Sequence, residues 1–172
     1  MTSHLAHLAH ALVLMTLELL LTAFLESFCM DEVQKLLQKK GGRELYRQAI
    51  VANVVNVAIF GLLTYWVSVA FACVPGPLTV VEQLRGMMGV FFIQGLLFYF
   101  IHKAFHEVKW LYPAHSFHHK FNDVVLPSSA SAVSVTEFVV AYMFPIFASC
   151  VLVTNDRASA VYVSSLPYCL CL

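Results

Sequence analysis

Long apolar stretches dominate the chain and predict helices that cross a membrane. Residues 5–25 are mostly apolar and carry one acidic side chain, Glu18, and residues 49–74 contain no charged side chain. An α-helix rises about 1.5 Å per residue, so each stretch is long enough to cross a hydrocarbon core of about 30 Å. We therefore predict a transmembrane helix in each stretch.

Two further apolar stretches are shorter. Residues 86–101 hold sixteen uncharged residues, which reach about 24 Å as a helix, so flanking residues must complete a crossing. Residues 138–153 contain Pro145, which favours either a span or a kinked, re-entrant segment. Glu137 precedes this stretch, at a helix entrance where the helix dipole stabilises a carboxylate. The pattern predicts an all-α integral membrane bundle with three to four transmembrane helices.

The basic residues of the polar segments predict how the bundle is oriented. They gather in the loop after the first stretch and in the loop after the third, whereas the loop around residues 75–77 holds only Arg85. Loops rich in Lys and Arg stay on the cytosolic side, and these two loops share one side if three segments span. The segment that follows the third stretch is therefore predicted to face the cytosol. The basic residues of the two loops are Lys35, Lys39, Lys40, Arg43, Arg47, Lys103, Lys109 and Lys120.

The composition agrees with a membrane protein. Hydrophobic residues make up 60% of the chain and charged residues 12%, against roughly 45–50% and about 25% in soluble domains. The formal net charge is zero, and nucleic-acid binding requires clustered Lys and Arg, so lipid rather than nucleic acid is the predicted partner. The five cysteines are scattered and suggest neither a disulfide framework nor a thiolate metal site.

Five of the eight histidines lie in one short segment. His102 and His106 are four residues apart, so on a helix their rings project from one face. His115, His118 and His119 repeat this arrangement with spacings of three and four. Neutral imidazole is a good ligand for Fe, Zn, Cu and Ni, which favours a metal site over histidines that merely line a membrane surface. The remaining histidines, which the predicted topology puts at the opposite membrane face, are His4, His7 and His10.

The neighbours of these histidines narrow the chemistry. A zinc protease of the HExxH type needs a Glu directly after the first His, but Lys103 stands there and Glu107 follows the second His. Pro113 suits the first turn of a new helix that carries the second histidine group. Asn122 and Asp123 follow that group, where they would either hydrogen-bond a ligand's outer ring nitrogen or form a turn.

The histidine segment resembles the fatty acid hydroxylase/sterol desaturase superfamily. The chain reads FYFIHKAFH at residues 98–106, LY at 111–112 and HSFHH at 115–119. These stretches match the HxxxH and HxxHH boxes of the superfamily in the same order. The resemblance covers residues 86–145. By matching position, the implied ligands of a non-haem di-iron centre are His102, His106, His115, His118 and His119.

The resemblance also implies an activity and a setting. Such an enzyme is an integral protein of the endoplasmic reticulum whose iron centre faces the cytosol and serves lipid biosynthesis. It uses O₂ and two electrons either to hydroxylate a C–H bond of a fatty acyl chain or sterol or to introduce a double bond into it. The electrons commonly come from a cytochrome b5-type or other NAD(P)H-linked donor.

The chain also departs from the superfamily pattern. No histidine follows His119, so a third box of the HxxHH type is missing. Lys103 stands where the superfamily has an Arg after the first histidine of the first box, and Gln94 and Gly95 stand where many members have an Asp. Two hypotheses stay open at this point: an iron-dependent membrane oxidoreductase, or a truncated, non-catalytic relative that binds metal or lipid or associates with full-length partners. The predicted division is an N-terminal transmembrane segment (1–30), a basic cytosolic loop (31–48), an incomplete hydroxylase-like membrane region (49–153) and a divergent tail (154–172).

Overall fold

The computed structural model describes residues 2–72 and 78–153, which form helices and connecting turns with no strand among them. The predicted tail, residues 154–172, and the loop at residues 75–77 lie outside the described residues. The elements in chain order are α1 (Thr2–Ser27), α2 (Met30–Gln38), α3 (Gly42–Val55), η1 (Asn56–Gly61), α4 (Leu62–Val67), η2 (Ser68–Ala72), α5 (Val80–Glu107), α6 (Tyr112–His115), η3 (His118–Phe121), η4 (Pro127–Ser129), α7 (Val135–Glu137), η5 (Phe138–Met143) and α8 (Phe144–Leu152).

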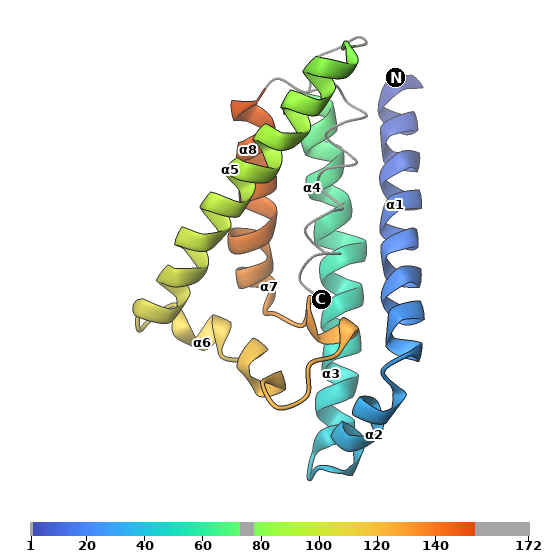
Figure 1. The fold of residues 1–172 in the computed structure, drawn as a ribbon, viewed down its shortest axis with the longest axis vertical. Helices are drawn as coiled ribbons and strands as arrows, with labels where there is room; N and C mark the ends of the chain where they lie inside the picture. Colours follow the sequence, from blue (N-terminus) through green and yellow to red (C-terminus); the bar gives the residue numbers. More distant parts are fainter. Residues whose placement is uncertain (1, 73–77, 154–172) are drawn as a thin grey trace.

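Four helical rods are long and apolar enough to cross a membrane, which confirms the predicted all-α membrane fold (Figure 1). They are His4–Ser27, Gly42–Phe71, Val80–Glu107 and Val135–Leu152. The third rod is longer than its apolar stretch because it starts at a capping box and ends beyond the first histidine box. Thr79 Oγ1 accepts a hydrogen bond from the backbone N–H of Glu82 at 3.3 Å, and the Glu82 carboxylate accepts one from the Thr79 N–H at 2.9 Å.

The fourth rod runs through Pro145 without a break. Pro145 lies in the first turn of α8, directly after the π-helical turn η5. Proline has no backbone N–H, so inside a regular helix it removes one backbone hydrogen bond. The π turn changes the hydrogen-bonding register just before Pro145, so the proline stands where a new helical segment begins. Of the two predicted forms of this segment, a continuous rod of spanning length is the one observed.

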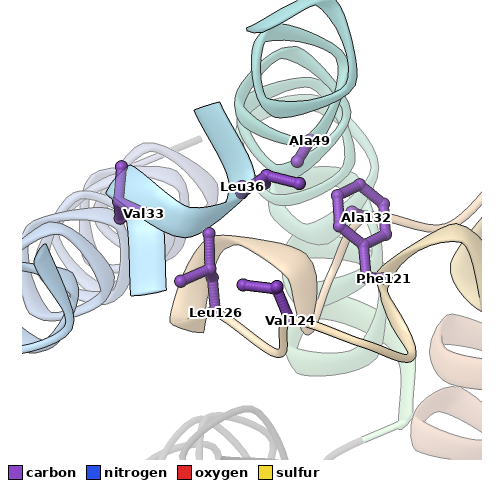
Figure 2. Packing of buried hydrophobic residues seen from close by; sticks show 7 residues of the cluster. All are labelled: Val33, Leu36, Ala49, Phe121, Val124, Leu126 and Ala132. Carbon is purple, nitrogen blue, oxygen red and sulfur yellow. The ribbon is translucent and has the colours of Figure 1, made fainter. Parts of the chain in front are cut away.

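The first and third loops meet at one end of the bundle, as predicted from the topology (Figure 1). Helix α2 packs there against the segment that follows the second histidine box, and Lys39 Nζ lies 3.2 Å from Asp123 Oδ2. The hydrophobic cluster that joins the two loops is shown in Figure 2 and consists of Val33, Leu36, Ala49, Phe121, Val124, Leu126 and Ala132. Which side of a membrane this end faces stays a prediction.

Two buried polar side chains fasten the third loop to the first two rods. At the end of α1, Glu26 accepts hydrogen bonds from the Tyr46 hydroxyl at 2.5 Å and from the backbone N–H of Ser128 at 2.8 Å. In η1, the Asn56 amide donates to the carbonyls of Ser131 at 2.9 Å and Val133 at 3.1 Å. The loop between α6 and α7 is therefore held by side chains that lie more than seventy residues away in sequence.

Candidate metal centre

The first histidine box occupies the end of α5 that reaches the joined loops. His102 and His106 lie one turn apart on the same face, as predicted, and their Nε2 atoms are 3.3 Å apart. The ring of Phe98, one turn earlier, stacks on His102 with 5.1 Å between centroids and an interplanar angle of 24°. Tyr142 contacts the Phe98 ring edge to face, with 5.1 Å between centroids and an interplanar angle of 67°. Aromatic packing thus restricts the orientation of the His102 ring.

The second box folds back onto the first. After α5 ends, the chain turns into the short helix α6, with Pro113 in its first turn as predicted. His115 Nε2 lies 3.0 Å from His106 Nε2 and 2.8 Å from His119 Nε2. Four imidazoles from two segments therefore turn their Nε2 atoms toward one another.

The spacing of these nitrogens fits a shared metal ion. A ligand nitrogen binds a zinc-sized ion at about 2.0–2.1 Å, so two ligands of one ion lie about 3 Å apart. The ligand atoms of His102, His106 and His115 all lie within 4.8 Å of one another. His115 is fully buried, His102 is half-buried and His106 is exposed, so the group opens to the surface on the His106 side.

His118 lies at the edge of this group. Its ring centroid is 6.5 Å from that of His102 and 5.8 Å from those of His115 and His119. Its Nδ1 atom is buried and has no hydrogen-bond partner within the described part of the chain. The geometry therefore separates His118 from the four rings whose Nε2 atoms converge, although all five were grouped by spacing in the sequence.

Burial keeps two rings of the second box, His115 and His118, in the protonation state that binds metal. Burial, with a smaller contribution from the neighbouring imidazoles, lowers the pKa of His115 to about 4. The pKa of His118 is also lowered, chiefly by burial and then by His119 and His106. Both rings are therefore neutral at pH 7, and a neutral imidazole offers a lone pair to a metal ion.

Glu137 lies beside the histidines, although its position in the sequence predicted only a helix entrance. Its Oε1 atom lies 2.6 Å from His115 Nδ1, and both side chains are fully buried. The same oxygen is 3.8 Å from His102 Nδ1. The signal available in the sequence was an acidic residue beside a membrane-spanning stretch, a position that is usually functional.

The two residues predicted as hydrogen-bonding neighbours have different surroundings. Asn122 lies beside the second box, with its Nδ2 atom 3.3 Å from His119 Nδ1. Asp123 is largely exposed and pairs with Lys39 of the first loop. At the opposite end of the bundle, the N-terminal histidines lie far from the centre, where His4 packs against Trp66 with 6.4 Å between ring centroids (Figure 1).

A cavity of about 340 Å³ adjoins the histidines. His102 and His118 form part of its wall, and most of the remaining wall is aromatic or aliphatic. Asn122 and Ser129 add polar groups. The residues that line it are Phe98, His102, His118, Phe121, Asn122, Val125, Ser129, Ala130 and Tyr142.

These features define a helical membrane protein with a histidine-rich candidate metal centre at one end of its bundle. Residues 87–170 match the family model described as "Fatty acid hydroxylase", a family of the fatty acid hydroxylase/sterol desaturase superfamily. The match confirms the resemblance drawn from the histidine boxes. At the level of the family, the match supports a membrane-bound, lipid-modifying oxidoreductase, and the family generally uses non-haem iron. No curated protein and no solved structure matches this chain.

Proposed function

We propose that this chain holds non-haem iron with its histidine boxes and uses O₂ to hydroxylate or desaturate a fatty acyl chain or a sterol. The observation that carries the proposal is the convergence of four imidazole Nε2 atoms, with successive separations of 2.8–3.3 Å, beside an apolar cavity. The iron ligands would be His102, His106, His115, His118 and His119, with a di-iron centre by resemblance to the superfamily.

Iron bound there would supply the redox chemistry that couples O₂ reduction to oxidation of a C–H bond. The protein supplies donors and geometry. Neutral, buried rings such as His115 bind the metal without first losing a proton, and the packing of Phe98 on His102 limits rotation of a ligand ring. Pre-organised ligands lower the cost of assembling the centre when the metal binds.

The cavity is the proposed substrate pocket. Its volume of about 340 Å³ falls in the range of small-molecule sites, about 300–1,000 Å³. Phe98, Phe121 and Tyr142 would present rings to an apolar carbon chain and exclude water from it. His102 and His118, two of the proposed metal ligands, form part of the same wall. A lipid carbon held in this pocket would lie next to the metal ligands.

The proposed setting is the endoplasmic reticulum membrane, with the histidine end facing the cytosol. The second histidine box is followed by Phe121 and Val124, which pack against Leu36 of the basic first loop, so the histidines and that loop share one end of the bundle. A soluble or membrane-anchored donor of the cytochrome b5 type, or another NAD(P)H-linked donor, would deliver electrons at this end. Within this proposal the region 49–153 acts as the catalytic part, residues 1–30 as a membrane anchor and residues 31–48 as the cytosolic loop.

Metal analysis and product analysis of the full chain test the proposal. The chain is purified in lipid nanodiscs, its iron content is measured, and fatty acids and sterols are incubated with ¹⁸O₂ and a reducing system of NAD(P)H, reductase and cytochrome b5. We expect bound iron together with either an ¹⁸O-labelled alcohol or a new double bond. His106→Ala should lose both iron and product, whereas His10→Ala, an exposed histidine outside the centre, should keep them. A wild-type chain that binds no iron and forms no product would overturn the proposal.

A further inference from the structure

The carboxyl group of Glu137 lies between the two histidine boxes, on the side away from the converging Nε2 atoms. We propose that Glu137 is a positioning residue of the metal centre, which accepts a hydrogen bond from the Nδ1–H of His115 and thereby directs the Nε2 lone pair of His115 toward the metal. This proposal rests on the proposed function in one respect: it assumes that the histidine centre binds iron.

The distances around His115 define which nitrogen must carry the proton. Its Nδ1 lies 2.6 Å from Glu137 Oε1, while its Nε2 lies 3.0 Å from His106 Nε2 and 2.8 Å from His119 Nε2. A neutral imidazole has one N–H donor and one lone pair. An ionised carboxylate accepts hydrogen bonds only. With Glu137 ionised, its contact selects the His115 tautomer that has hydrogen on Nδ1 and leaves Nε2 free for a metal ion.

The same carboxyl group also borders the first box. His102 Nδ1 is 3.8 Å from Glu137 Oε1, and this nitrogen is buried with no hydrogen-bond partner among the residues described. The second oxygen, Glu137 Oε2, is likewise buried without a hydrogen-bond partner in that part of the chain. Glu137 therefore has unused acceptor capacity next to an unpaired ring nitrogen, and one side chain stands behind a histidine of each box.

The local fold holds Glu137 in this position. Ser134 Oγ accepts the backbone N–H of Glu137 at 3.1 Å and so starts the helix at α7. The next residue, Phe138, is fully buried and stacks on Tyr142 with an interplanar angle of 17°. Tyr142 in turn contacts Phe98, the ring that stacks on His102, so the aromatic packing links the Glu137 helix to the first box.

A purely structural role at the helix start does not explain the burial. An acidic residue in the first helical turn is stabilised by the helix dipole while it remains in water. Glu137 is instead completely buried, and burying a carboxylate has a large cost unless it is paired and hydrogen-bonded. The partner that offsets this cost is His115, a ring that is itself fully buried.

The tautomer of His115 tests the proposal without any metal. In the metal-free chain labelled with ¹⁵N-histidine, the ring nitrogens of His115, assigned with His115→Gln, should show hydrogen on Nδ1. Glu137→Ala should shift the population toward hydrogen on Nε2, and Glu137→Gln, which keeps an acceptor oxygen, should restore most of the wild-type pattern. An unprotonated Nδ1 in the wild type, or an unchanged tautomer in Glu137→Ala, would overturn the proposal.

Metal affinity gives the second measurement. Loss of a group that hydrogen-bonds a metal-ligating histidine typically weakens metal binding about 10–100-fold. Glu137→Ala should therefore lower the Co²⁺ affinity, measured by chelator competition, by that factor. It should also change the visible absorption spectrum of bound Co²⁺. Glu18→Ala, which removes a carboxyl group from the first membrane helix, is the matched control and should leave both unchanged. Equal affinity and equal spectra for Glu137→Ala and wild type would refute the positioning role. A wild-type chain that shows the Nδ1–H tautomer but binds no metal would refute the proposed function alone.

Discussion

The hydrogen bonds of Glu26 give a sharp prediction about how the histidine end is held together. Glu26 ends the first rod, and its two oxygens accept from the Tyr46 hydroxyl of α3 and from the backbone N–H of Ser128 in η4. Glu26 and Ser128 are 94% and 98% buried, whereas Tyr46 is only half-buried. Glu26→Ala removes both acceptors from donors that cannot fully reach water.

The expected loss follows from the burial of each donor. A buried backbone N–H left without a partner costs about 1–3 kcal/mol, and an ordinary hydrogen bond at a half-buried hydroxyl contributes about 0.5–1.5 kcal/mol. Glu26→Ala should therefore lower the free energy of unfolding by about 1.5–4.5 kcal/mol. Tyr46→Phe removes only the hydroxyl, so it should cost about 0.5–1.5 kcal/mol.

A double-mutant cycle is the assay. Unfolding of the chain in mixed micelles is followed by circular dichroism as SDS is increased, for wild type, Glu26→Ala, Tyr46→Phe and the double variant. Residues that share a hydrogen bond give non-additive changes, so Tyr46→Phe should cost close to nothing once Glu26 is gone. Equal costs of Tyr46→Phe in both backgrounds would refute the hydrogen bond and the magnitude derived from it.

Three further predictions address the first loop, the pH dependence and the pocket. A Cβ added at Gly42 would lie 1.8 Å from the Leu36 carbonyl oxygen, so Gly42→Ala should lower the free energy of unfolding by about 1–3 kcal/mol or more in the same assay. Gly95→Ala is the control and should not destabilise, because an added Cβ there would meet no described atom within 4 Å beyond its chain neighbours and the backbone of its own helix. Burial lowers the pKa of His118 in the folded chain below its ordinary value of 6.5. As the pH falls through that value the unfolded chain binds more protons than the folded chain, so the metal-free protein should be less stable at pH 5 than at pH 7, and His118→Gln should reduce this difference in the same unfolding assay. Ala130→Phe should fill part of the cavity, so the products measured by gas chromatography should come from shorter or smaller lipids while the iron content stays unchanged. A loss of iron would contradict the assignment of Ala130 to the pocket wall.

The outward faces of the bundle show why the fold was readable from the sequence. Large apolar side chains such as Leu17, Phe24 and Phe92 are exposed on the long helices, as expected where the surrounding medium is lipid. Hydrophobic length is a local property of the chain, so the four rods follow from runs of apolar residues. Helical spacing is local as well, and it correctly put His102 and His106 on one face.

What the sequence by itself determined is thus the set of membrane helices, the shared end of the two basic loops and the two histidine groups. Only the tertiary structure decided which ring nitrogens meet, since this depends on how the chain turns after α5 and how α7 packs beneath it. That packing buried Glu137 against His115, left His118 at the edge of the group and paired Asp123 with Lys39. Contacts between residues far apart in sequence carry no periodic signal, and their geometry is set by the packing of whole helices.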